Sequence, residues 1–210
     1  MRICIYGCLA LLLMTGPRQS ALAAQAPPPA TPLATPPLGD EDKANQLSEQ
    51  VGKLMVKCVN LLTAQDPQAL DYCKQQRDLA DQYPPHQRTV DKMMAHDEYG
   101  IALAAFDHKK EALEEFNQEV ALVPKAVKPG SDEWSTAYWH RARIYSQLGE
   151  DDKAEHDYRA AEENFRKTSQ NTMTQATEKK RRTILRQHAA LLEKEGKSEA
   201  AQRLLEEARK

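Results

Sequence analysis

The chain has 210 residues, enough for one ordinary domain with additional segments. It carries 29 basic and 31 acidic residues, which give a formal net charge of −2. Because nucleic-acid-binding domains usually carry a basic surplus, this class of function is disfavoured.

The first residues have the three-part form of a secretory signal peptide. Arg2 precedes an apolar run of 14 residues, 3–16, and small residues follow at 21–24. Cleavage is expected after Ala23 or Ala24, so that residues 1–23 form the signal peptide. The alternative is an uncleaved membrane anchor, but a spanning helix needs about 20 apolar residues. We therefore predict a periplasmic or secreted protein with no stable membrane span after cleavage, and a net charge of −4.

Residues 24–39 read AQAPPPATPLATPPLG and hold six of the twelve prolines. Such a segment has little to bury and cannot form a helix. We expect an extended, polyproline-like tether, with featureless disorder as the alternative.

The remainder, residues 40–210, shows eight apolar stripes at helical spacing and no convincing strand alternation. The second stripe is expected to begin at Asp66-Pro67, where Asp would cap the helix and Pro would take its first position. Eight helices with short turns inside each pair predict an all-α domain of about four antiparallel hairpins. The expected hairpins cover residues 41–82, 87–124, 132–167 and 172–209.

Three of these hairpins place small and large residues at the same offsets. The segment YSQLGEDDKAEHDYRAAEEN, residues 145–164, carries the third copy of the pattern. The recurring positions are Gly100, Phe106-Asp107, Ala112 and Phe116, then Ala142, Leu148-Gly149, Ala154 and Tyr158, then Ala189, Gly196, Ala201 and Leu205. The first hairpin is degenerate, and its best fit places Leu54, Cys58, Leu61 and Leu70 in these slots.

This pattern resembles the tetratricopeptide repeat, in which small residues lie where two helices cross and large residues lie between them. The resemblance implies a right-handed α-solenoid. The intervals from Ala112 to Ala154 and from Ala154 to Ala201 are 42 and 47 residues and depart from the family's period of about 34. A plain helical bundle is the alternative, but three hairpins that share their offsets favour the solenoid.

Two cysteines, Cys58 and Cys73, remain after signal cleavage and lie at equal distances from the first turn, near Gln65-Asp66. Antiparallel helices bring such positions opposite one another, and an exported protein meets an oxidising compartment. We predict a disulfide between them, with two buried free thiols as the alternative.

The sequence contains no recognisable catalytic, metal or cofactor motif. None of the six histidines has metal-ligand spacing, and neighbouring carboxylates point apart on a helix. We expect no cofactor, no metal and no enzymatic activity. An enzyme of unfamiliar type would require His140, His156 and carboxylates to gather in one pocket. The basic run Lys179–Arg182 is interpreted as a solvated helix face, with an anionic-ligand site as the alternative.

The resemblance implies that the first helix of each hairpin lines a groove that holds a peptide or a partner helix. Among the residues that the shared offsets assign to this groove, we expect five to bind the partner: Asp97, Ile101, Trp139, Arg143 and Arg186. Ile101 and Trp139 would supply apolar contacts, and the two arginines would orient an acidic group. For Trp139, packing against a neighbouring helix or loop is the alternative.

The predicted function is a non-catalytic protein–protein interaction scaffold in the cell envelope. The second hypothesis is a structural protein that self-associates into a homo-oligomer through its last hairpin, where Ala200, Ala201, Leu204, Leu205 and Ala208 could pair with another copy.

Overall fold

The computed structural model describes residues 39–84, 87–167 and 174–209. The predicted signal peptide, residues 1–23, and nearly all of the predicted tether lie outside these ranges.

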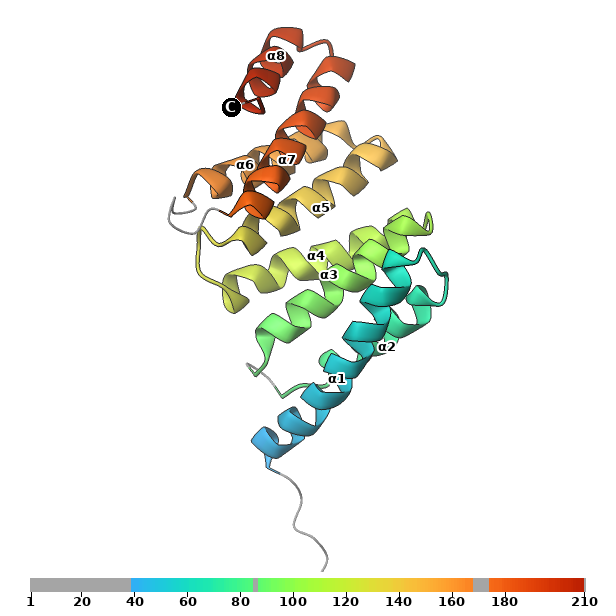
Figure 1. Cartoon of the computed structure of the whole chain (residues 1–210). Helices are drawn as coiled ribbons and strands as arrows, with labels where there is room; N and C mark the ends of the chain where they lie inside the picture. Colours follow the sequence, from blue (N-terminus) through green and yellow to red (C-terminus); the bar gives the residue numbers. More distant parts are fainter. Residues whose placement is uncertain (1–38, 85–86, 168–173, 210) are drawn as a thin grey trace, which may run out of the picture. The chain divides into compact units, whose positions relative to one another are not determined.

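The described residues form eight α-helices and no strand, as predicted (Figure 1). The helices are α1 (Asp40–Thr63), α2 (Ala69–Ala80), α3 (Thr89–Ala105), α4 (Lys109–Ala126), α5 (Asp132–Leu148), α6 (Asp151–Lys167), α7 (Gln175–Lys194) and α8 (Ser198–Glu207). Several boundaries differ from the predicted ones. Among them, α2 begins at Ala69 instead of Pro67, and α4 continues through Pro124 to Ala126.

Helices that follow one another along the chain pack together in pairs. The hairpins α1/α2, α3/α4, α5/α6 and α7/α8 are joined by contacts of α2 with α3, α4 with α5 and α6 with α7 (Figure 1). Each first helix also contacts the next first helix, so α1, α3, α5 and α7 form one layer. The apolar core is divided into successive clusters along this stack, as in a solenoid and unlike a bundle with one shared core.

All four hairpins turn with the same backbone geometry. A residue in the left-handed conformation ends each first helix, at positions 65, 107, 149 and 196, with φ of 54°, 67°, 78° and 77°. The next N–H donates to a carbonyl five residues back, as in Asp66 to Leu61 at 2.9 Å and Glu150 to Tyr145 at 2.9 Å. This is the Schellman pattern. The first hairpin therefore keeps the turn of the others, although its sequence pattern is the weakest.

A small residue seven positions before each turn lies at the crossing of the two helices. Cys58, Gly100, Ala142 and Ala189 occupy these positions, and all are buried. On the return helices Ala112, Ala154 and Ala201 are 0% exposed, as the predicted packing requires. In the second hairpin the ring of Phe116 lies directly over Gly100.

The first hairpin closes its crossing with a covalent bond. The predicted disulfide joins Cys58 and Cys73, whose Cα atoms are 4.9 Å apart. Cys73 lies eight residues after the left-handed residue of its turn. Phe116 and Tyr158 lie nine residues after theirs, so Cys73 takes nearly the same place on the return helix. The small-residue slot of α2 is likewise one position closer to the turn, and it is filled by the fully buried Ala69 and not by the predicted Leu70.

We expect reduction of the Cys58–Cys73 bond to lower the free energy of unfolding by about 3 kcal/mol, because the bond closes a segment of about 16 residues in the unfolded chain. Urea unfolding with and without reductant measures this loss. The Cys58→Ser/Cys73→Ser double variant is the control, since its midpoint should not respond to reductant. An equal response of both proteins would contradict the prediction.

Gly100→Ala should destabilise the protein by about 1–3 kcal/mol, since overpacking displaces neighbours in a dense core. The added Cβ would lie 2.7 Å from Cε1 of Phe116, a ring that is only 2% exposed. Gly52→Ala is the matched control: a Cβ there meets nothing within 4 Å. Because Ala is favoured over Gly inside a helix, Gly52→Ala should raise the free energy of unfolding by up to about 1 kcal/mol. Thermal unfolding of both variants gives the comparison, and equal effects would show that Gly100 is not held by contact with Phe116.

Candidate functional site

The predicted partner-binding residues all lie on the layer of first helices. Asp97 and Ile101 lie on α3, Trp139 and Arg143 on α5, and Arg186 on α7. Because α3 contacts α5 and α5 contacts α7, the three helices that carry them are neighbours. Their side chains have different environments.

Trp139 is half-buried and links α5 to α7. Its indole Nε1–H donates to Oε1 of Gln187 at 2.7 Å, and its ring packs against the core cluster around Tyr158. Trp139 therefore packs against a neighbouring helix, while part of its side chain stays exposed. The guanidinium of Arg143 lies over the same ring, 5.4 Å from its centroid.

Arg143 also lines a hollow of about 330 Å³ between α5 and α7. The lining residues are Arg143, Ser146, Gln147, Tyr158, Gln187, Ala190, Leu191 and Lys194. Lys194 is neutralised by Asp151 at 2.6 Å, whereas Arg143 makes no ion pair within the described part of the chain. Stacking on Trp139 holds the guanidinium in place and leaves its N–H groups available to a ligand.

Arg186 is exposed and has no ion-pair partner among the residues that the structure describes. It lines a depression of about 670 Å³ along α7 together with Lys179. The neighbouring basic residues are largely paired within the fold: Lys180 with Asp132 at 2.5 Å, and Arg182 with Glu178 at 3.1 Å. These residues are thus partly buried ion-pair partners and not the fully solvated face that was predicted, while Lys179 and Arg186 stay unneutralised within the described ranges.

Ile101 and Asp97 are both engaged within the protein. Ile101 is half-buried and packs against the core cluster around Phe116 and Ile144. Asp97 Oδ1 lies 2.6 Å from Nδ1 of His140 on α5, although the Asp97 side chain remains 25% exposed. On α3, the predicted groove residues thus serve to join two hairpins.

Each of three buried histidines is held by a carboxylate from another helix. His96 on α3 lies 2.6 Å from Glu115 on α4, and His188 on α7 lies 2.6 Å from Glu162 on α6. His140 completes the set with Asp97. These contacts fasten neighbouring helices where apolar packing alone would leave a buried imidazole without partners.

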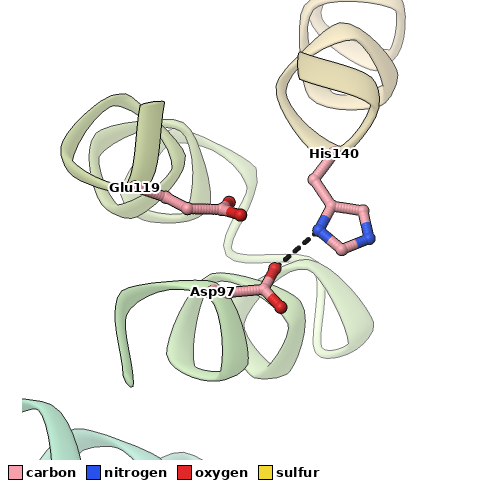
Figure 2. A group of neighbouring side chains, drawn as sticks. All are labelled: Asp97, Glu119 and His140. Carbon is pink, nitrogen blue, oxygen red and sulfur yellow. Dashed lines mark hydrogen bonds and ion pairs between the residues drawn. The ribbon is translucent and has the colours of Figure 1, made fainter. Parts of the chain in front are cut away.

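The site of His140 contains a second acid, Glu119 on α4, which is 2% exposed (Figure 2). Its Oε2 is buried without a hydrogen-bond partner, and its carboxylate points toward Asp97 and His140. Burial raises the pKa of Glu119 well above its usual range, and the charge of Asp97 raises it further, against the opposing effect of Arg141 and Lys180.

This cluster was not predicted, because its members come from three helices and lie 22 and 21 residues apart in sequence. No local spacing could reveal it. The one signal in the sequence was the position of Glu119. It follows Phe116 by three residues and so lies on the same, apolar face of α4.

Comparisons with known proteins bear on the fold. The sequence matches no family model and no curated protein. A Podosopora anserina protein described as a putative kinesin light chain with nearly identical TPR-like repeats is similar in structure, with a TM-score of 0.53 and 15% identity over 76% of this chain and 93% of that one. A variant of that protein gives a TM-score of 0.54 at the same identity and coverage. BtubC (BKLC) from P. vanneervenii gives 0.53 at 16% identity, over 81% of this chain and 72% of that one. The chain has a tetratricopeptide-repeat-like fold.

The pocket that would have favoured an enzyme, with His140, His156 and carboxylates together, does not form in the described residues, since the His156 side chain is 77% exposed beside Asp157. In the described part of the chain, no helix is long and apolar enough to cross a bilayer.

We expect His96 to make stability depend on pH in the alkaline range. Burial lowers its pKa, but the hydrogen bonds and charges of Asp81 and Glu115 outweigh burial and raise the pKa to about 9. Because the folded pKa lies above the unfolded value of about 6.5, the stabilisation is complete below pH 6.5 and is lost as pH rises through 9. Urea unfolding between pH 6.5 and 9.5 should therefore show a steeper loss for the wild type than for His96→Gln. His156→Gln, at an exposed site, should follow the wild type, and parallel curves for wild type and His96→Gln would refute the assignment.

Proposed function

We propose that the protein is a non-catalytic protein–protein interaction scaffold of the cell envelope. Its first-helix layer binds an extended peptide or a partner helix that carries an acidic group. Arg143 and Arg186 orient this group, and the half-buried Trp139 contributes apolar surface.

The observation that carries this proposal is the hollow between α5 and α7. It holds an arginine without an ion-pair partner in the described part of the chain, fixed over an indole ring, beside the apolar surface of Leu191 and Ala190. An Arg guanidinium binds carboxylates with two parallel hydrogen bonds, and Trp and Arg dominate many interfaces. A side-chain carboxylate or a chain terminus of a partner fits this chemistry.

Two features support a location outside the reducing cytosol. The N-terminal residues have the form of a signal peptide, and the fold contains the Cys58–Cys73 disulfide. Disulfides persist in the periplasm and in secreted proteins. The Pro-rich segment 24–39 would separate the repeat domain from the surface to which the protein is recruited.

The alternative, self-association through the last hairpin, gains no specific support. Ala200, Leu204 and Leu205 on α8 are already packed in the core cluster around Leu192. The exposed large hydrophobic residues of the described ranges are Val56, Val59, Val90 and Met94, which lie on α1 and α3. Sedimentation of the purified protein separates a monomeric scaffold from a self-associating one.

Peptides selected from a displayed random library should carry an acidic side chain or a free C-terminus that binds at Arg143. Calorimetry with a selected synthetic peptide should show roughly 10–150-fold weaker binding to Arg143→Gln, because a hydrogen bond to a charged group contributes about 1.5–3 kcal/mol. Arg159→Gln is the matched control: this arginine lies on α6, is 68% exposed and pairs with Glu155. Equal weakening by both variants would indicate a net-charge effect and would reject the hollow as the binding site.

A further inference from the structure

We propose that Asp97, Glu119 and His140 form a binding site for a divalent transition-metal ion of the Zn²⁺ type, which fastens the second hairpin to the third. This inference does not depend on the proposed scaffold function, since it concerns the joint between α3, α4 and α5.

The geometry brings three ligand atoms together from three helices. One oxygen of Asp97, one of Glu119 and a ring nitrogen of His140 all lie within 4.8 Å of one another (Figure 2). Ligands around a tetrahedral Zn²⁺ at about 2.0–2.1 Å lie roughly 3.4 Å apart. On binding, Asp97 Oδ1 and His140 Nδ1, which are 2.6 Å apart, must therefore separate, and Glu119 must approach them. Oε2 of Glu119 accepts no hydrogen bond within the described residues, so no such bond holds this oxygen back.

The unpaired state of Glu119 is the observation that points to a ligand. A carboxylate with 2% exposure and a buried oxygen without a partner is costly unless something neutralises it. The two cations that influence it are engaged elsewhere: Arg141 bonds Asp157 at 2.6 and 3.0 Å, and Lys180 bonds Asp132 at 2.5 Å. A bound cation would supply the charge that the protein does not.

The surroundings of His140 orient its ring toward this point. The imidazole lies 5.4 Å from the ring of Phe116 and 4.9 Å from that of Trp139, centroid to centroid. Nδ1 faces Asp97, so metal binding replaces this hydrogen bond and leaves the ring proton on Nε2. Entry is possible from the Asp97 side, where a quarter of the side chain is exposed.

The donor set selects the class of ion. One imidazole with two carboxylates suits Zn²⁺, Co²⁺ or Mn²⁺. Ca²⁺ requires six to eight oxygen ligands, and Mg²⁺ keeps most of its water, so neither finds its preferred shell here. Three protein ligands leave at least one position for water.

Calorimetric titration of the chelator-treated protein with ZnCl₂ tests the site. We expect about one Zn²⁺ per chain, a higher melting temperature with Zn²⁺ than with Ca²⁺ or Mg²⁺, and visible d–d absorption when Co²⁺ is added. Glu119→Gln keeps the shape and removes the buried charge, so this variant should fold. The Zn²⁺ affinity of Glu119→Gln should fall more than roughly 100-fold. Loss of a residue that only hydrogen-bonds to a metal ligand lowers metal affinity by roughly 10–100-fold, and loss of a ligand should cost more.

Glu162→Gln is the matched control. Glu162 is buried and lies 2.6 Å from Nδ1 of His188, so it forms a carboxylate–imidazole pair like that of Asp97 and His140. No second acid joins this pair in the described residues. The Zn²⁺ affinity of the Glu162→Gln variant should equal that of the wild type. Asp97→Asn, at a partly exposed position, serves if Glu119→Gln does not fold. Absence of binding, binding that survives in Glu119→Gln or Asp97→Asn, or equal loss in Glu162→Gln would each overturn the proposal.

Discussion

The close approach of two helices at a small residue is the constraint on which the rest of this structure depends. Gly100, Ala142 and Ala189 each lie seven residues before a turn, and each lets the return helix lie against its backbone. The contact is tight enough that Gly100 has no room for a methyl group under Phe116. Dense packing of this kind fixes the spacing of a hairpin, because larger residues would force the helices apart. Cys58 occupies the same position in the first hairpin, and its bond to Cys73 closes the crossing that Phe116 and Tyr158 fill in the second and third hairpins.

A second, polar set of contacts joins one hairpin to the next. His140 with Asp97, and His188 with Glu162, bridge helices of neighbouring hairpins, while His96 reaches Glu115 within its hairpin and Asp81 at the end of α2. Such buried pairs fix how neighbouring helices align, because a hydrogen bond requires a particular alignment of donor and acceptor, whereas apolar packing does not. Glu119 departs from this pattern because it is buried without a partner among the described residues. A buried polar group of this kind requires a specific explanation, and a bound ion is one that fits this site.

The layer of first helices combines both kinds of contact with exposed cationic groups. Ile101 and Asp97 are used within the protein, while Arg143 and Arg186 make no ion pair in the described residues. The face that the repeat pattern assigned to partner binding is therefore divided. Its α3 part holds the hairpins together, and its α5 and α7 parts carry Arg143, Arg186 and the hollow at which we propose that a partner binds.

The sequence by itself determined the helices, their pairing and the disulfide, because these depend on residues near one another in the chain. The shared offsets placed Ala112, Ala154 and Ala201 in the core. They also included Gly149 and Gly196, which the structure places at the left-handed positions of two turns. The tertiary structure alone decided how the side chains of different hairpins meet. It placed Trp139 against Gln187, and it brought Glu119 to Asp97 and His140 from three separate helices. These contacts depend on the register and the distance between helices, which no spacing along a single helix encodes.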